Sequence, residues 1–214
     1  MKGKFVTLEG CEGVGKSTQL RLLTEKLDAA GIAYVATREP GGSSIAEQIR
    51  KIILNADNAE MSDVCEALLY SAARAQHLAD VVLPALDAGK LVLCDRFIDS
   101  TFAYQGYAKG LGTALVDELN RIAIGDCVPD LTIFLDLEPE ESFARKGGAD
   151  KTDRLELLSP EFHRRVYEGY RLLAAREPER FVSVRPTGTK YETAEKVYAL
   201  LAERGILSTY GGKI

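Results

Sequence analysis

With 214 residues, the chain has the length of one globular domain, and 46% hydrophobic and 28% charged residues are ordinary for a protein with a sizeable core. A net charge of −5 gives no general attraction to nucleic acid or to anionic membranes, so neither is expected as a partner. No apolar run approaches the roughly 20 residues that span a bilayer, and the first residues lack a signal-peptide core. Four widely spaced cysteines without a CxxC pair predict reduced thiols. We therefore expect a cytoplasmic protein.

Apolar strand-like runs alternate with amphipathic helix-like runs along the chain. The strand-like runs are rich in Val, Ile, Leu and Phe and cover 4–9, 33–37, 91–95, 131–137 and 180–184. The helix-like runs cover 16–31, 44–54, 62–89, 113–125, 159–178 and 192–205. This alternation predicts one α/β domain over 1–214, with about five parallel strands between two layers of helices.

The first strand leads into a glycine loop. The stretch "GCEGVGKS", residues 10–17, fits G-x-x-x-x-G-K-[ST] between a strand and a helix, as a phosphate-binding P-loop requires. Converging backbone N–H groups and a helix N-terminus bind a triphosphate, while Lys16 is expected to reach its β- and γ-phosphates and Ser17 to bind Mg²⁺. The predicted ATP-binding residues are Gly10, Cys11, Glu12, Gly13, Val14, Gly15, Lys16, Ser17 and Thr18.

The strand-like run 91–95 ends in an acidic residue. Asp95 stands at its end, where nucleoside triphosphatases place a carboxylate that supports Mg²⁺ beside the glycine loop. A structural Asp that caps the next turn is the alternative. Arg96 either pairs with Asp95 or holds a second phosphate, and its place at the mouth of a phosphate site favours the phosphate.

Arginines near strand ends favour a kinase over a switch protein. A Ras-like GTPase would carry an N/T-K-x-D element after a later strand, and none appears. Phosphoryl transfer depends on neutralising negative charge, and the glycine loop itself offers no arginine. The basic, glycine-containing stretch 144–156 is therefore expected to be a short lid that supplies Arg145 and Arg154 and excludes water. A charged loop that only contacts solvent is the alternative.

Further motifs resemble one family. Tyr70 and Arg74 lie four residues apart on a predicted helix and so share one face. Over residues 4–156 the chain closely resembles the bacterial thymidylate (dTMP) kinases, through "LEGCEGVGKST", "TREPGG", "LLYSAARAQH", "CDRFIDSTFAYQG", "PDLTIFLDL" and "TDRLE". The resemblance implies a three-layer P-loop NTPase fold and Mg²⁺-dependent transfer of the ATP γ-phosphoryl group to dTMP, giving dTDP. It also implies a homodimer formed through surface helices.

The resemblance assigns roles to the acceptor-side residues. Tyr70 is expected to stack on thymine and Arg74 to hydrogen-bond its exocyclic oxygen, with Thr101 and Gln105 at the base edge and Tyr104 against the sugar 2′ position. Arg96 and Arg38 or Arg50 are expected to grip the dTMP phosphate, and Glu39 and Pro40 to line the turn beside it. The predicted substrate-binding residues are Arg38, Glu39, Pro40, Arg50, Tyr70, Arg74, Arg96, Ser100, Thr101, Tyr104 and Gln105.

The predicted catalytic set joins the two sides. The resemblance places Glu12 where an acidic residue orients the acceptor or binds Mg²⁺-linked water, with the catalytic arginines coming from the lid. The set is Lys16, Arg96, Arg145, Arg154 and Glu12, with Ser17 and Asp95 as metal ligands. His77 and His163 are expected on helix surfaces. Two alternatives remain open, a kinase for another nucleoside monophosphate and an ATP-dependent switch or binding module.

Overall fold

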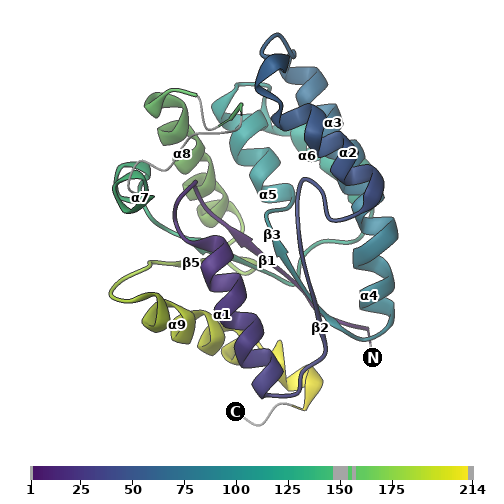
Figure 1. The fold of residues 1–214 in the computed structure, drawn as a ribbon, viewed down its shortest axis with the longest axis vertical. Helices are drawn as coiled ribbons and strands as arrows, with labels where there is room; N and C mark the ends of the chain where they lie inside the picture. Colours follow the sequence, from purple (N-terminus) through teal and green to yellow (C-terminus); the bar gives the residue numbers. More distant parts are fainter. Residues whose placement is uncertain (1, 147–153, 156–157, 212–214) are drawn as a thin grey trace.

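The chain folds around a five-stranded parallel sheet. The computed structural model describes residues 2–146, 154–155 and 158–211. The strands β1 (Phe5–Glu9), β2 (Tyr34–Arg38), β3 (Leu91–Asp95), β4 (Leu131–Leu135) and β5 (Phe181–Val184) lie in the order β2-β3-β1-β4-β5, and every neighbouring pair is parallel (Figure 1). This confirms the predicted sheet. Because its central strands are covered on both faces, their sequences are apolar almost throughout.

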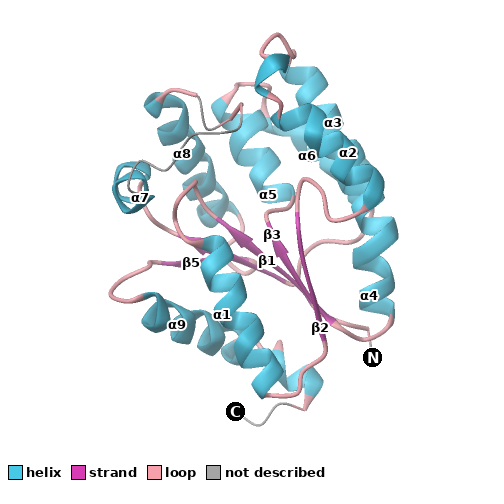
Figure 2. Ribbon diagram, in the orientation of Figure 1, coloured by secondary structure: helices cyan, strands magenta, loops and turns pink. Residues whose placement is uncertain are grey.

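Helices cover both faces of the sheet (Figure 2). They are α1 (Lys16–Ala29), α2 (Ser44–Leu54), α3 (Asp63–His77), α4 (Leu83–Asp87), α5 (Ile98–Thr101), α6 (Thr113–Ile124), α7 (Pro139–Lys146), α8 (Pro160–Arg176) and α9 (Lys190–Glu203). Leu78–Val82 joins α3 to α4, and Phe102–Ala108 continues α5, both as π-helix.

Successive residues of β1 point to opposite helical layers, as the two-residue period of a strand requires. Val6 belongs to a buried cluster that includes Leu27 of α1 and Val197 of α9, and those two helices pack together. Phe5 belongs to a cluster with Val82 beside α4. The fold is therefore three-layered, as predicted.

Two helical segments were missed from the sequence. The stretch 98–108 is almost wholly buried, so it shows no alternation between an apolar and a polar face. The segment Pro139–Lys146 is short and charged, although Pro139 at its first position and acidic residues in its first turn favour a helix start. Of the predicted lid over 144–156, residues 147–153 and 156–157 lie outside the described part of the chain.

The surface positions expected for the two histidines are wrong. His77 is 0% exposed and His163 is 2% exposed. The His77 ring lies between Thr37, near the end of β2, and Glu39, in the turn that follows the strand. The His163 ring packs edge-on against Phe143 and Phe162. His77 is covered by a segment about 40 residues away in the chain, and His163 by Phe143 of α7 together with its neighbour Phe162. A local pattern does not reveal this cover.

Candidate active site

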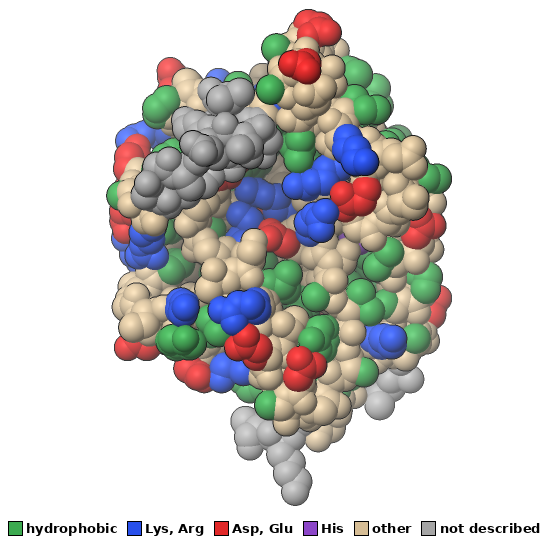
Figure 3. Space-filling view, viewed as in Figure 1, with side chains coloured by type: hydrophobic (Ala, Val, Ile, Leu, Met, Phe, Trp, Pro, Cys, Tyr) green, Lys and Arg blue, Asp and Glu red, His purple; other side chains and the backbone are tan. Residues whose placement is uncertain are grey.

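A pocket of about 380 Å³ opens at the carboxyl ends of the central strands. Figure 3 shows that Lys and Arg side chains gather in the hollow on this face. Parallel sheets bind ligands at this edge because helix N-termini and loops converge there. The pocket is lined by Glu12, Gly13, Lys16, Ser17, Arg38, Glu39, Pro40, Arg50, Leu54, Tyr70, Arg74, Asp95, Arg96, Phe97, Ser100, Tyr104, Gln105 and Leu155.

The glycine loop connects β1 directly to the N-terminus of α1. Gly10 has φ 145° and a Cβ there would lie 3.0 Å from the carbonyl oxygen of Leu135, so a larger residue does not fit. Gly15 caps α1 in the left-handed conformation without a side-chain cap. The first backbone N–H groups of α1 therefore have no side-chain acceptor at the cap, which suits an anion.

Lys16 lies folded against its own loop. Its Nζ donates to the carbonyl oxygens of Gly10 at 2.9 Å and Cys11 at 3.0 Å. Burial, followed by the positive charge of Arg96, lowers the Lys16 pKa to about 8. The ammonium group is thus desolvated, and among the residues that the structure describes its hydrogen-bond partners are neutral carbonyls, so a phosphate oxygen is a stronger partner for it.

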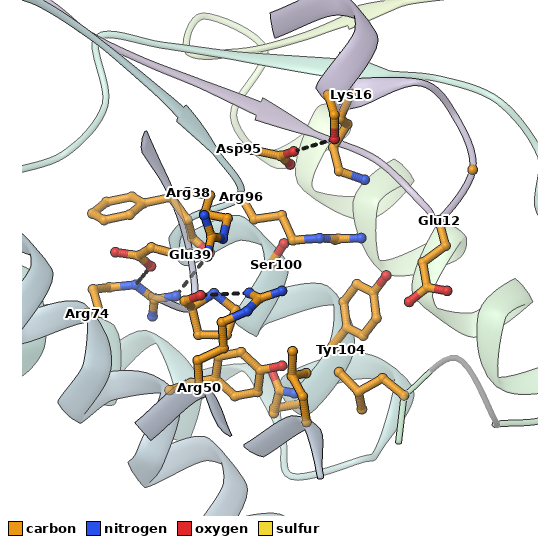
Figure 4. A pocket seen from close by; sticks show the side chains of 18 residues that line it. Glu12, Lys16, Arg38, Glu39, Arg50, Arg74, Asp95, Arg96, Ser100 and Tyr104 are labelled. Carbon is orange, nitrogen blue, oxygen red and sulfur yellow. Dashed lines mark hydrogen bonds and ion pairs between the residues drawn. The ribbon is translucent and has the colours of Figure 1, made fainter. Parts of the chain in front are cut away.

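Ser17 and Asp95 bring two hard oxygen atoms together beside Lys16. The Ser17 hydroxyl donates to Asp95 Oδ2 at 3.3 Å (Figure 4). Helix α5 begins with Phe97 as its cap and has no side-chain cap, so Asp95 does not cap that helix. Within the described ranges, no group of three or more His, Cys, Asp or Glu side chains is placed to hold a metal. One hydroxyl and one carboxylate fit Mg²⁺, which takes most of its ligands from water and phosphate.

Arg96 lies in the middle of the pocket. It has φ 70°, the only positive value at a non-glycine position in the described chain, and this turns the backbone sharply out of β3. Nη1 donates to the hydroxyls of Ser100 and Tyr170, both at 3.2 Å, and the guanidinium lies 5.1 Å from the Tyr104 ring centre. Figure 4 shows it between Lys16 and Tyr104. Arg96 therefore binds these hydroxyls in place of the Asp95 pairing considered from the sequence.

The turn after β2 builds another wall. The Glu39–Pro40 peptide bond is cis, and the Glu39 carboxylate is buried. It accepts from Arg74 Nε at 2.8 Å and contacts His77 Nδ1 at 2.9 Å. Because a carboxylate can only accept, the His77 ring must carry a proton on Nδ1, the nitrogen that faces Glu39. Arg50 of α2 donates to the Pro40 carbonyl at 2.7 Å, which ties the turn to the pocket wall.

Arg74 is only 1% exposed and is fixed by the protein on several sides. Nε donates to Glu39, Nη1 to Asn120 Oδ1 at 2.8 Å, and Nη2 to the Phe97 carbonyl at 3.1 Å and Thr101 Oγ1 at 3.0 Å. Four of the five guanidinium N–H groups thus have partners among the described residues, which leaves one N–H on Nη1 for a ligand. Thr101 does not line the pocket; it supports Arg74 from behind.

The pocket is also lined by three of the residues predicted to bind the acceptor, Tyr70, Tyr104 and Gln105. The Tyr104 hydroxyl is buried without a hydrogen-bond partner among the described residues, and burial raises the pKa of this phenol well above its usual value. Gln105 Nε2 donates to Glu66 Oε1 at 2.7 Å. Because the amide nitrogen is used in this way, the amide oxygen is the atom that Gln105 can offer a ligand.

The predicted lid arginines lie away from Lys16. Arg145 on α7 donates to the Pro186 carbonyl at 3.2 Å. Arg154 is buried, donates to the Ile53 carbonyl at 3.1 Å and forms an ion pair with Glu66. Neither lines the pocket, whereas Glu12 does. Of the glycine-loop set, Gly13, Lys16 and Ser17 also line it, while Gly10, Cys11, Val14, Gly15 and Thr18 shape the loop around them.

Sequence reasoning missed several residues of the site. Leu54, Phe97 and Leu155 line the pocket as apolar wall, which no motif signals. Glu9 and Tyr170 do not line the pocket, but Tyr170 contacts Arg96 and Glu9 contacts Tyr170. Glu9 had a usable signal, because it is a carboxylate at the end of an otherwise apolar buried strand, directly before the glycine loop.

Together, the parallel sheet, the glycine loop before α1 and a pocket with arginines at the strand ends define a P-loop nucleotide kinase. The chain matches the family model described as "Thymidylate kinase" over residues 8–197. It is 53% identical to a thymidylate kinase of Bacillus velezensis over 186 residues, 86% of this chain and 88% of that protein. Against a thymidylate kinase of a Synechococcus species it is 47% identical over 207 residues, 97% of this chain and 98% of that protein.

A solved structure agrees with these relatives. The crystal structure of thymidylate kinase from Ehrlichia chaffeensis matches with a TM-score of 0.77 and 32% identity, covering 94% of this chain and 99% of that chain. The chain belongs to the thymidylate kinase family. This confirms the family that the sequence motifs indicated.

Proposed function

We propose that this protein is a dTMP kinase, which transfers the γ-phosphoryl group of ATP to dTMP and releases dTDP and ADP. One observation carries the proposal. A single continuous pocket is lined at one end by Lys16 of the glycine loop and at the other by Tyr70 and Arg74 of α3. A kinase needs this arrangement, because two anionic substrates must meet end to end.

On the donor side, the backbone amides of Gly10–Thr18 and the N-terminus of α1 bind the ATP phosphates. Lys16 leaves the two loop carbonyls that it now contacts and binds the β- and γ-phosphate oxygens. Ser17 and Asp95 would hold Mg²⁺, which would supply positive charge to the phosphate oxygens. The donor-side residues thus act by holding the ATP phosphates in position and by neutralising their negative charge.

On the acceptor side, the pyrimidine stacks on Tyr70. The remaining Nη1 proton of Arg74 is donated to the exocyclic oxygen of thymine, and the Gln105 amide oxygen accepts from the ring N–H beside it. Cytosine presents the reverse pattern at these two positions, so this pair of contacts disfavours it. The Tyr104 ring crowds the 2′ position and favours deoxyribose. Thr101 contributes through Arg74.

In the transfer step, a phosphate oxygen of dTMP attacks the γ-phosphorus of ATP while the bond to the β,γ-bridging oxygen breaks. The dTMP phosphate is largely dianionic near neutral pH, so it needs no base to remove a proton. Arg96, with Arg38 and Arg50 near it in the pocket, neutralises the dTMP phosphate. Glu12 orients the acceptor. To add charge at the γ-phosphate, Arg145 and Arg154 would have to leave the Pro186 carbonyl and Glu66 that they contact in this structure.

We also propose a homodimer in the cytoplasm. Helices α3 and α6 pack together and leave apolar side chains exposed, with Leu68 at 51% and Ile122 at 68%. Exposed apolar side chains of this size favour contact with a second copy. All four cysteines are free, which fits a reducing compartment. In the part of the chain that the structure describes, the helices are too short or too polar to cross a bilayer.

The test is an assay of ADP release with Mg-ATP and a panel of nucleoside monophosphates, together with identification of the diphosphate product. We expect dTMP to give the highest kcat/KM and dTDP to be the product. A higher kcat/KM with another monophosphate would assign a different acceptor. ATP-dependent association with a partner, and no phosphoryl transfer to any nucleotide, would make the protein a switch.

A further inference from the structure

Glu9 is a buried carboxylate to which none of the roles above has been given. It is 0% exposed, ends β1 and directly precedes Gly10 of the glycine loop. The two-residue strand period puts its side chain on the same face as Phe5 and Thr7. That face is covered by the segment that carries the acceptor-side residues, so Glu9 lies between the two halves of the site.

Each carboxylate oxygen of Glu9 has its own partners. Oε1 accepts from the backbone N–H groups of Phe97 at 2.7 Å and Ser100 at 3.3 Å, at the N-terminus of α5. Oε2 accepts from the Ser100 hydroxyl at 2.7 Å and the Tyr170 hydroxyl at 2.8 Å. The charge is thus met by a helix N-terminus and two hydroxyls, which satisfies a buried carboxylate.

The two hydroxyls connect Glu9 to Arg96. A hydroxyl carries a single proton, so one that donates to Glu9 presents only lone pairs to its other neighbours. Arg96 Nη1 lies 3.2 Å from both the Ser100 and the Tyr170 oxygen. The Ser100 and Tyr170 oxygens also lie 2.9 Å from each other. A carboxylate is a stronger acceptor than a hydroxyl, so each hydroxyl gives its one proton to Glu9. The carboxylate therefore makes both hydroxyls acceptors for Arg96, although it does not touch the guanidinium itself.

We propose that Glu9 is a positioning residue that fixes the guanidinium of Arg96 at the transferring phosphoryl group through the hydroxyls of Ser100 and Tyr170. It also holds the start of α5, which carries the acceptor-side residues, in register with the glycine loop that binds ATP. This inference rests on the proposed function, since it takes Arg96 to bind phosphate.

The protonation state of Glu9 decides whether the arrangement holds. Burial, and then the charge of Asp99, raise the Glu9 pKa to about 7. A protonated Glu9 donates its own proton, so one hydroxyl turns its hydrogen away and ceases to be a fixed acceptor. Arg96 should therefore lose its position as the pH falls through about 7. The charged and titratable groups around Glu9 are Arg96, Asp99, Tyr170, Lys16 and Cys94.

The first variant is Glu9→Gln, which keeps the shape but removes the charge and puts an NH₂ group where an acceptor was. We expect kcat to fall about 100-fold, as misplacement of a reacting group by about 1 Å does. The KM for ATP should stay within about two-fold. The wild-type acid limb of kcat near pH 7 should disappear, leaving the limb of the dTMP phosphate near pH 6.

Two further variants keep the test decisive. Tyr170→Phe removes one of the two hydroxyls, and we expect kcat to fall about 10-fold, again with little change in the KM for ATP. Thr7→Val is the matched control, because Thr7 lies on the same strand and face, and among the described residues its hydroxyl bonds Thr132 at 2.8 Å and not Glu9, Ser100 or Tyr170. We expect it to leave kcat and the pH profile unchanged.

Crystal structures of the Glu9→Gln and Tyr170→Phe proteins provide a readout besides activity. We expect Arg96 to be displaced or split between positions in both. Unchanged Arg96 geometry together with unchanged kcat in either folded variant would overturn the proposal, and if Glu9→Gln fails to fold, Tyr170→Phe decides. If wild-type protein prefers another monophosphate, the proposed function fails, and the same readouts with that substrate still test Glu9.

Discussion

The acceptor side and the donor side of the pocket are built differently. On the acceptor side, Arg74 is held by four bonds to other residues, and Glu39 is fixed by Arg74 and His77. On the donor side, the hydrogen bonds of the Lys16 ammonium to described residues go to carbonyls of its own loop. Under the proposed function, the residues expected to read the base are therefore in place before the ligand arrives, whereas we expect Lys16 to move when triphosphate binds. This difference predicts that mutations on the two sides separate acceptor binding from turnover.

The largest expected effect is that of Lys16→Ala. Because Lys16 neutralises charge on the transferred group, we expect kcat to fall by about 10³-fold or more. The dTMP Kd, measured by calorimetry without ATP, should stay within about three-fold, because the acceptor side is already assembled. A loss of less than about ten-fold in kcat would count against this role for Lys16.

Arg74→Ala should act on the opposite side. We expect the KM for dTMP to rise about 100-fold and the KM for ATP to change less than about two-fold, since the lost contact reads only the base. The variant also leaves Glu39 buried beside His77 alone, so the free energy of unfolding should fall by about 3 kcal/mol.

Arg121→Ala provides a control for the Arg74 variant. Arg121 lies on α6 and pairs with Glu118 at the surface. We expect unchanged kinetics and an unchanged melting temperature, because an exposed ion pair contributes little to stability. Equal rises in both KM values for Arg74→Ala would remove Arg74 from the base site and would erase the difference between the two sides.

Tyr104→Ala tests whether the acceptor side also selects the sugar. We expect the preference for dTMP over its ribose analogue, taken as a ratio of kcat/KM values, to narrow about ten-fold. Tyr104→Phe keeps the ring and should keep most of the preference. If both variants retain the wild-type ratio, Tyr104 does not exclude the 2′-hydroxyl.

The smallest expected effect lies at the outer end of the acceptor-side network. Thr37 Oγ1 lies 2.7 Å from His77 Nε2, and we assign the donated proton to Thr37 because Nδ1 carries the histidine proton. Thr37→Val leaves that nitrogen buried without a donor, so unfolding free energy should fall by about 1–2 kcal/mol. The KM for dTMP should rise about two- to three-fold. If the melting temperature and the KM for dTMP are both unchanged, the contact between Thr37 and His77 does not help to hold Arg74 and Glu39 in place.

The sequence was sufficient for features that depend on local order. The glycine loop follows a fixed spacing, and the strands are recognisable because a covered parallel sheet needs apolar runs. The family motifs extended this to Arg96 and Tyr104, which both lie in the pocket. These features need no knowledge of which distant segments meet.

Features that depend on distant partners were not recoverable in this way. Arg154 pairs with Glu66, which lies 88 residues away, so its basic surroundings suggested only a lid. His77 was placed at the surface because its helix is amphipathic, yet the turn at Glu39 covers it. Glu9 was passed over because its partners come from α5 and α8, which are far away in the chain. The spacing of residues along the sequence shows which of them lie on the same face of a helix or strand. It does not show which distant segment packs against that face.

The central claim is that ATP and dTMP meet in one pocket, with triphosphate on the glycine loop and pyrimidine on Tyr70. The most direct measurement is a crystal structure of the protein with dTMP and a non-hydrolysable ATP analogue. The account predicts thymine against Tyr70 and Arg74, the β- and γ-phosphates against Lys16 and the loop amides, and Arg96 at the dTMP phosphate. Thymine bound away from Tyr70, or a triphosphate outside the Gly10–Thr18 loop, would contradict it.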